Sequence, residues 1–313
     1  MTAVATRPRL GFLGVGWIGR NRLEAIGASG VAEVAALADP ALDGAATSLD
    51  ELLEEDLDGV VIATPSALHA AEAIAALERG LAVFCQKPLA LDAPTARAVV
   101  DAAEAADRLL AVDFSYRFTD AARRVRDLVR GGELGDVFAV DLAFHNAYGP
   151  DKQWTGDPAL SGGGCVIDLG IHLVDLALWM IGFPTVRHVT STLHGQPLED
   201  HAAVQLELDG GTVVRLACSW RLHAGSDCVF EASVYGTRGG ASMRNVDGSF
   251  FDFVADRHDG TRTQRIVAPP DEWGGRAAVD WARRLAAGKR FDSAARENVR
   301  VHEVLDRIYG RTT

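Results

Sequence analysis

The chain has 313 residues, of which 48% are hydrophobic and 24% are charged. This composition is typical of a folded globular protein, and the length favours two domains. The net charge of −12, with no basic stripe to offset it, argues against a nucleic-acid partner. The four cysteines lack the paired spacing of a zinc site, so we expect free thiols and no metal. Residues 1–8 contain no apolar leader, and we expect no run long and apolar enough to cross a bilayer; we therefore expect a cytoplasmic protein with no membrane partner.

The first third of the chain alternates short apolar strands with helices. Strands are expected at 9–13, 31–38, 59–63, 81–85 and 109–114. Helices are expected at 20–26, 47–55, 69–79 and after Asp92. Such alternation is typical of βαβ units with a parallel sheet. The sequence therefore predicts a Rossmann-type domain over residues 1–118.

A glycine motif directly follows the first strand. Gly14-Val-Gly16-Trp17-Ile18-Gly19 stands between a strand and a helix, where such a motif binds a dinucleotide. The first glycine allows the tight turn, the second lets the backbone approach the pyrophosphate, and the third lets helix and strand pack closely. Asp39 lies 20 residues past Gly19, at the position of an acid that binds the ribose 2′-hydroxyl. A purely structural glycine turn is the alternative, but the two matches together favour a cofactor, and the carboxylate favours NAD over NADP.

The period of the sequence changes in the second half. A helix is expected at 119–130, followed by a strand at 137–145 in which alternate residues share a face. Further strands are expected at 186–193, 202–208, 212–220, 229–235, 241–244 and 250–255. Helices are expected at 271–287 and 293–308. We therefore expect a second α/β domain, 119–313, with an open and mostly antiparallel sheet. Since few helices remain to cover both sheet faces, an open apolar face predicts a homodimer or homotetramer.

The stretch from Ser161 to Gly182 combines three glycines with a helical pattern. The glycines give a loop whose backbone can approach a ligand closely. Asp168 and His172 are four residues apart, so a regular helix projects them from one face. A carboxylate beside an imidazole is an acid–base pair. The alternative is an acid that suits the helix dipole and a histidine in a polar pocket, and this stretch alone leaves both interpretations open.

Five motifs in this order resemble the Gfo/Idh/MocA family of oxidoreductases over nearly the whole chain. They are Gly14-x-Gly16-x-x-Gly19, Asp39-Pro40, Ala63-Thr-Pro-Ser-x-x-His69, Gln86-Lys87-Pro88 and Gly163-Gly-x-x-x-Asp168-x-x-x-His172. The resemblance implies an NAD(P)-dependent dehydrogenase acting on a secondary hydroxyl group of a sugar or cyclitol, and pairing of subunits through the second sheet. It implies that Lys87, Asp168 and His172 form the catalytic group, and that Thr64, Pro65 and His69 lie along the cofactor. Gln86 stands where the family usually has glutamate, which removes a negative charge beside Lys87.

These residues suit the chemistry that the resemblance implies. His172 serves as the general base for the hydroxyl proton, and Lys87 stabilises the developing alkoxide. Asp168 binds the substrate or orients the imidazole. We further expect Gln86 and Arg117 beside the cofactor, and His145 and Trp154 beside a sugar or polyol substrate. A non-catalytic sensor of the same fold is the alternative, and the intact set of Lys87, Asp168 and His172 argues for the enzyme.

Overall fold

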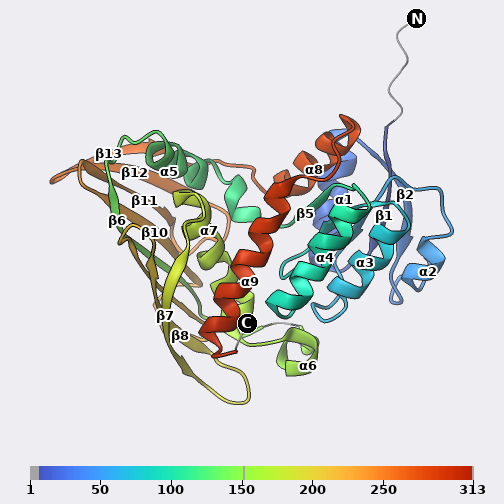
Figure 1. Cartoon of the computed structure of the whole chain (residues 1–313), viewed down its shortest axis with the longest axis horizontal. Helices are drawn as coiled ribbons and strands as arrows, with labels where there is room; N and C mark the ends of the chain where they lie inside the picture. Colours follow the sequence, from blue (N-terminus) through green and yellow to red (C-terminus); the bar gives the residue numbers. More distant parts are fainter. Residues whose placement is uncertain (1–6, 151, 312–313) are drawn as a thin grey trace, which may run out of the picture. The chain divides into compact units, whose positions relative to one another are not determined.

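The computed structural model describes residues 7–150 and 152–311, and these form two compact units (Figure 1). The first unit contains the described residues up to Ser115 together with Gly274–Val299. The second contains Tyr116–Trp273 and the described residues from Arg300. Each unit has a β-sheet of its own, and the two are described separately below.

The first unit contains a five-stranded parallel sheet in the order β2-β1-β3-β4-β5. Its strands are β1 (Arg9–Leu13), β2 (Glu33–Ala38), β3 (Gly59–Ile62), β4 (Ala82–Cys85) and β5 (Leu110–Val112). Its helices are α1 (Trp17–Ser29), α2 (Leu49–Leu52), α3 (His69–Glu78), α4 (Ala93–Ala105) and α8 (Arg276–Ala286). The predicted Rossmann-type sheet is confirmed. Because the strand order reverses between β1 and β3, ligands of such sheets bind beyond the carboxyl ends of these strands.

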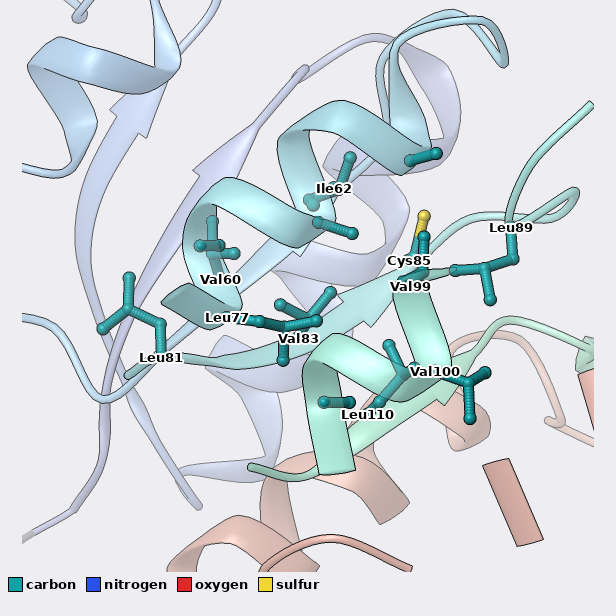
Figure 2. Close-up of a cluster of buried hydrophobic side chains, with 14 of the residues drawn as sticks. Val60, Ile62, Leu77, Leu81, Val83, Cys85, Leu89, Val99, Val100 and Leu110 are labelled. Atoms are coloured by element: carbon teal, nitrogen blue, oxygen red, sulfur yellow. The ribbon is translucent and has the colours of Figure 1, made fainter. Parts of the chain in front are cut away.

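The core of this unit explains why its strand ends are firmly placed. Every residue of β3 and β4 is buried, as expected for parallel strands covered on both faces. Figure 2 shows Val60 and Val83 packing with Leu77 of α3 and with Val99 and Val100 of α4. The polar residues that follow β3 and β4 therefore extend from a closely packed layer.

Residues 274–299 belong to this first unit, whereas we expected them in a second domain of 119–313. Helix α8 places the buried Trp281 ring 5.7 Å from the ring of Phe84 in β4. Arg296 forms ion pairs with Asp101 and Glu104 of α4. These contacts join segments almost two hundred residues apart, so local sequence patterns do not reveal them. Helix α8 also begins at Arg276, later than the expected start at residue 271.

The second unit contains an eight-stranded sheet in the order β13-β12-β11-β10-β6-β9-β8-β7. Its strands are β6 (Val137–Asn146), β7 (Val186–His194), β8 (His201–Leu208), β9 (Val213–Ser219), β10 (Cys228–Gly236), β11 (Gly239–Asn245), β12 (Phe253–Asp259) and β13 (Arg262–Val267). Its main helices are α5 (Asp120–Arg130), α6 (Pro158–Ser161) and α7 (Ile171–Ile181), and α9 (Glu297–Ile308) enters it at Arg300. Only the β6–β9 pair is parallel, so the expected mostly antiparallel sheet is confirmed. Strand β13 was not expected, because it carries mainly exposed polar residues at the sheet edge.

The uncovered face of this sheet mixes charged and polar side chains with apolar ones, so it is not the open apolar face that we expected. Leu206 of β8 and Leu216 of β9 are buried, whereas Gln205 and Arg215 are exposed. Arg215 forms an ion pair with Asp141 of β6 across the parallel pair of strands, at 2.7 Å. Since side chains alternate between faces, buried apolar residues such as Leu206 and Leu216 lie on the side that α7 covers. The predicted oligomer therefore loses this support and stays a prediction.

The stretch Pro158–Ile181 is long and apolar enough, by composition alone, to cross a membrane. This corrects the expectation that the chain has no such run. However, 83% of its most apolar window is buried inside the protein, as in the central helix of a folded domain.

Candidate active site

The glycine loop after β1 has the geometry that a dinucleotide requires. Gly14 has a φ of +83°, and a Cβ atom there would lie 2.7 Å from the Ala63 backbone. A Cβ atom at Gly19 would lie 2.1 Å from the Gly14 carbonyl oxygen, so α1 packs closely against the strand. At Gly16 a Cβ atom would meet nothing within 4 Å, which leaves space for a ligand. These are the three roles of the dinucleotide motif.

The start of helix α1 suits an anion. The helix begins at Trp17, and Gly16 provides no side-chain cap. The first turn contains no acidic residue, so the backbone N–H groups of Trp17 and Ile18 face no carboxylate of their own helix. A helix end of this kind binds phosphate groups through its N–H groups and dipole. The loop and helix end therefore fit the pyrophosphate of NAD or NADP.

Asp39 ties this loop to the end of β2. Its Oδ2 accepts a hydrogen bond from the Val15 N–H at 2.7 Å, and its Oδ1 accepts one from the Ala41 N–H at 2.9 Å. Each carboxylate oxygen can accept more than one hydrogen bond. The Asp39 carboxylate therefore retains the capacity to accept from ribose hydroxyl groups while it orders the loop.

His69 lies inside the unit rather than on a ligand-facing surface. Its Nδ1 is 2.7 Å from the Pro88 carbonyl oxygen, and its Nε2 is 2.8 Å from the Thr64 carbonyl oxygen. Burial lowers the pKa of His69, and the charge of Lys87 acts in the same direction, whereas the two carbonyl contacts raise it. Both ring nitrogens are thus engaged with backbone. His69 therefore joins the Thr64–Pro65 turn to the segment after β4, and its place along the cofactor stays a prediction.

A buried polar network explains the glutamine at position 86. Gln86 Nε2 donates a hydrogen bond to Asp113 Oδ2 at 2.6 Å. Arg22 Nε donates to the same oxygen at 2.5 Å, and the Ser115 hydroxyl donates to Asp113 Oδ1 at 2.7 Å. Gln86, Asp113 and Arg22 are all buried. The negative charge that Gln86 lacks is therefore present on Asp113, after the neighbouring strand, where Arg22 balances it.

Lys87 is held from both sides by these two sets of contacts. The preceding residue, Gln86, is anchored on Asp113, and the following residue, Pro88, is anchored on His69. Lys87 itself is half-buried. The sequence pattern did not identify Asp113 or Arg22 as part of this arrangement. The signal was present, since a charged residue occupies the inner face of α1 and another ends an apolar strand.

Asp168 and His172 lie within the second unit, but not on one regular α-helix. Val166–Gly170 is a π-helical turn, and α7 begins after it at Ile171. The expected four-residue spacing on one helical face therefore does not hold there, and π-helical turns are frequent at functional sites. Trp220 Nε1 donates a hydrogen bond to Asp168 Oδ2 at 3.0 Å. His172 is mostly buried, with its ring centroid 4.9 Å from that of Tyr116.

The glycines before this turn contact protein, which corrects the expectation that they admit a ligand. A Cβ atom at Gly164 would lie 2.0 Å from the Glu199 carbonyl oxygen, and one at Gly163 would lie 2.2 Å from the Tyr309 hydroxyl oxygen. The Glu199 side chain accepts hydrogen bonds from the N–H groups of Gly164 and Val166, at 2.8 and 3.0 Å. The buried carboxylate of Glu199 thus caps the start of the helical stretch that carries Asp168.

His145 and Trp154, which we expected beside the substrate, lie in different elements of the second unit. His145 points to the uncovered face of the sheet, where its Nδ1 lies 2.7 Å from the Ser219 hydroxyl oxygen, whereas its neighbour Phe144 faces His172. The structure therefore does not bring His145 to Asp168 and His172. Burial lowers the pKa of His145, and the nearby His201 lowers it further. Trp154 lies in a 3₁₀ turn, Gln153–Gly156, with the Lys152 ammonium 5.8 Å from its ring centroid.

Arg117 anchors helix α7. Its Nη2 lies 2.6 Å from an Asp175 oxygen, and its Nε donates to both carboxylate oxygens. The guanidinium also lies 5.8 Å from the ring centroid of Trp179. Asp175 and Trp179 thus pack against Arg117 within the second unit. The place of Arg117 beside a cofactor stays a prediction.

Comparison with known proteins agrees with this arrangement. Residues 8–114 match the family model described as an oxidoreductase family with an NAD-binding Rossmann fold, and residues 122–242 match a Gfo/Idh/MocA C-terminal domain. The rhizopine catabolism protein MocA of Rhizobium meliloti is 32% identical, over 76% of this chain and 79% of that protein. The chain belongs to the Gfo/Idh/MocA family of oxidoreductases.

Two further members extend the comparison. The D-apiose dehydrogenase of Paraburkholderia graminis is 29% identical, over 90% of this chain and 77% of that enzyme. The crystal structure of GenD2 from gentamicin A biosynthesis, in complex with NAD, is 27% identical. It superimposes with a TM-score of 0.82, covering 97% of this chain and 94% of GenD2. This Gfo/Idh/MocA oxidoreductase therefore shares its fold with a protein that binds NAD.

Proposed function

We propose that this Gfo/Idh/MocA oxidoreductase is a cytoplasmic dehydrogenase of a sugar, sugar derivative or cyclitol, in which Lys87 and His172 handle the proton of the reacting hydroxyl group. The observation that carries the proposal is that buried contacts hold the backbone on both sides of Lys87. The residues on both sides of it are fixed by buried contacts, Gln86 on Asp113 and Pro88 on His69. An enzyme needs its charged groups held in place before the reaction, because reorganisation during the reaction costs free energy.

Each residue has one role in this proposal. The Gly14–Gly19 loop and Asp39 would hold NAD, which would supply the acceptor for the hydride of the carbinol carbon. The His172 imidazole accepts the hydroxyl proton, and the Lys87 ammonium donates a hydrogen bond to the same oxygen as negative charge develops on it. Asp168, whose carboxylate is oriented by Trp220, binds a neighbouring hydroxyl group of the substrate or steers the imidazole. The D-apiose dehydrogenase supports a sugar substrate class. No observation among the described residues favours a non-catalytic sensor.

The cofactor preference rests on Asp39. Its carboxylate accepts from a ribose 2′-hydroxyl group but repels a 2′-phosphate group. Pro40 and Ala41 follow it, so no basic residue directly after Asp39 is available to bind that phosphate. We therefore propose NAD rather than NADP.

We also propose a homodimer or homotetramer. The support is the resemblance to family members that pair through the second sheet. Light scattering at micromolar concentration tests this, and a monomer would contradict it.

The test of the proposed function is a screen for NADH formation with a panel of sugars and cyclitols. We expect turnover of at least one compound with NAD, and slower turnover with NADP. His172→Ala and Lys87→Ala should each lower the rate by about 10²–10⁴-fold while NAD binding stays nearly unchanged. Near-normal turnover by His172→Ala would contradict the assigned role.

A further inference from the structure

Tyr116 is fixed beside His172 by an aromatic cluster. It lies in a short 3₁₀ turn, Ser115–Phe118, at the start of the second unit. Its ring stacks on Phe230 with 4.5 Å between centroids and contacts His172 edge-on at 4.9 Å and 85°. Three more rings surround it, those of Phe144, Phe253 and Trp273. A ring held by five aromatic neighbours has few alternative positions, so its hydroxyl group is fixed as well.

The hydroxyl group of Tyr116 has no hydrogen-bond partner among the described residues. It makes no hydrogen bond to residues 7–150 or 152–311. Its oxygen is not among the fully buried polar atoms that lack a partner there, so it keeps contact with solvent. Burial raises the pKa of Tyr116, and the neighbouring Cys228 and Asp168 groups raise it further. The phenol therefore stays protonated at neutral pH, and it is a hydrogen-bond donor rather than a base.

We propose that the Tyr116 hydroxyl group binds the substrate by donating a hydrogen bond to a second hydroxyl oxygen, adjacent to the one that His172 deprotonates. The inference rests on the proposed function and deepens it. The His172 ring contacts this phenol, and Cys228 and Asp168 are also near it. A substrate hydroxyl group beside His172 can accept the hydrogen bond that the Tyr116 hydroxyl group has to donate.

This arrangement selects one chemical class of substrate. A compound with a hydroxyl group on the carbon next to the reacting one gives the Tyr116 hydroxyl group an acceptor. An analogue that lacks this hydroxyl group leaves the Tyr116 hydroxyl group without an acceptor, and sites built to bind a hydroxyl group reject such analogues strongly. The vicinal diols of sugars and cyclitols have the required pattern, whereas simple secondary alcohols do not.

The test compares Tyr116→Phe with the intact protein, using turnover and calorimetric sugar binding to the NAD-loaded protein. The substitution keeps the ring and removes only the oxygen, so the aromatic cluster is preserved. We expect kcat/KM for the best sugar to fall by about 10–100-fold, mainly through KM, with NAD affinity unchanged. For the corresponding deoxy analogue the variant and the intact protein should differ by less than about 2-fold, because the group that Tyr116 contacts is absent. Tyr235→Phe, on the uncovered sheet face, is the matched control and should change neither readout.

The outcomes separate this inference from the function on which it rests. If the intact protein oxidises sugars and Tyr116→Phe is equally active on all of them, the role of Tyr116 is refuted and the dehydrogenase stands. If the intact protein binds sugars without oxidising them, the dehydrogenase is refuted, and the binding data alone decide on Tyr116. An equal loss for the sugar and its deoxy analogue would show a structural role and would also overturn the inference.

Discussion

Exchanging Gln86 for glutamate restores the residue usual in the family and places a second carboxylate in a buried network. Gln86 Nε2 lies 2.6 Å from Asp113 Oδ2, and Arg22 is the cation that contacts this oxygen. In Gln86→Glu an acceptor oxygen replaces the donor nitrogen. Two carboxylates then share one guanidinium, at a site where Gln86 is 8% and Asp113 1% exposed.

The magnitude of the effect follows from the short distance. Two unit charges about 3 Å apart repel by roughly 5 kcal/mol at an effective dielectric constant of about 20. Protonating the introduced carboxyl group, with an ordinary pKa of about 4.3, costs about 3.7 kcal/mol at pH 7, and this sets the upper limit. A hydrogen bond between the protonated group and Asp113 offsets about 1 kcal/mol of it. We therefore expect Gln86→Glu to lower the free energy of unfolding by about 2–3 kcal/mol at pH 7.

The pH dependence identifies the cause. Because the introduced acid is protonated in the folded protein at pH 7, its folded-state pKa lies above about 7, well above its unfolded value of about 4.3. The loss therefore vanishes near the unfolded value and grows as the pH rises from there toward the folded pKa. Loss of packing alone would show no such dependence on pH.

Urea unfolding of both proteins at pH 7.5 and pH 5 measures this difference. The double variant Gln86→Glu/Asp113→Asn reverses the donor and acceptor and restores a single carboxylate opposite Arg22. It should recover more than half of the lost stability at pH 7.5. Equal destabilisation at both pH values, or no recovery in the double variant, would refute the role of charge in this network.

Three further changes test the candidate site. Asp39→Asn keeps an acceptor for the Val15 N–H but removes the charge, so calorimetry should show a reduced preference for NAD over NADP; an unchanged ratio would contradict the role of Asp39. His69→Phe should make the free energy of unfolding depend less on pH below about pH 6.5. Burial lowers the pKa of His69, so below that pH the unfolded chain takes up a proton that the folded chain does not. In the intact protein the free energy of unfolding therefore decreases as the pH decreases, and the variant lacks this contribution. Equal slopes in urea unfolding for both proteins would argue against this. Trp220→Phe removes one hydrogen bond from the Asp168 carboxylate and should raise KM by about 5–10-fold, measured by steady-state kinetics, with NAD binding as the control. An unchanged KM would show that this bond does not position Asp168.

The sequence alone determined the features that depend on neighbouring residues. The Gly14–Gly19 loop was predicted because each glycine serves a local backbone need between one strand and one helix. The parallel and antiparallel sheets followed from strand–helix alternation in one half and two-residue periodicity in the other. Lys87 and His172 were singled out by short motifs, and their roles remain proposals. These patterns are local, so a reader of the sequence can recognise them.

Only the tertiary structure decided which distant residues meet. Asp113 replaces the charge missing at Gln86 through a bond between neighbouring strand ends, 27 positions apart in the chain. Trp281, late in the chain, packs against Phe84 of the first unit. Gly164 lies in close contact with the Glu199 backbone rather than beside a ligand. A π-helical turn then sets how Asp168 is presented. Each of these depends on close packing between segments far apart in sequence, and because such packing is settled by the shape of the whole core, no local pattern encodes it.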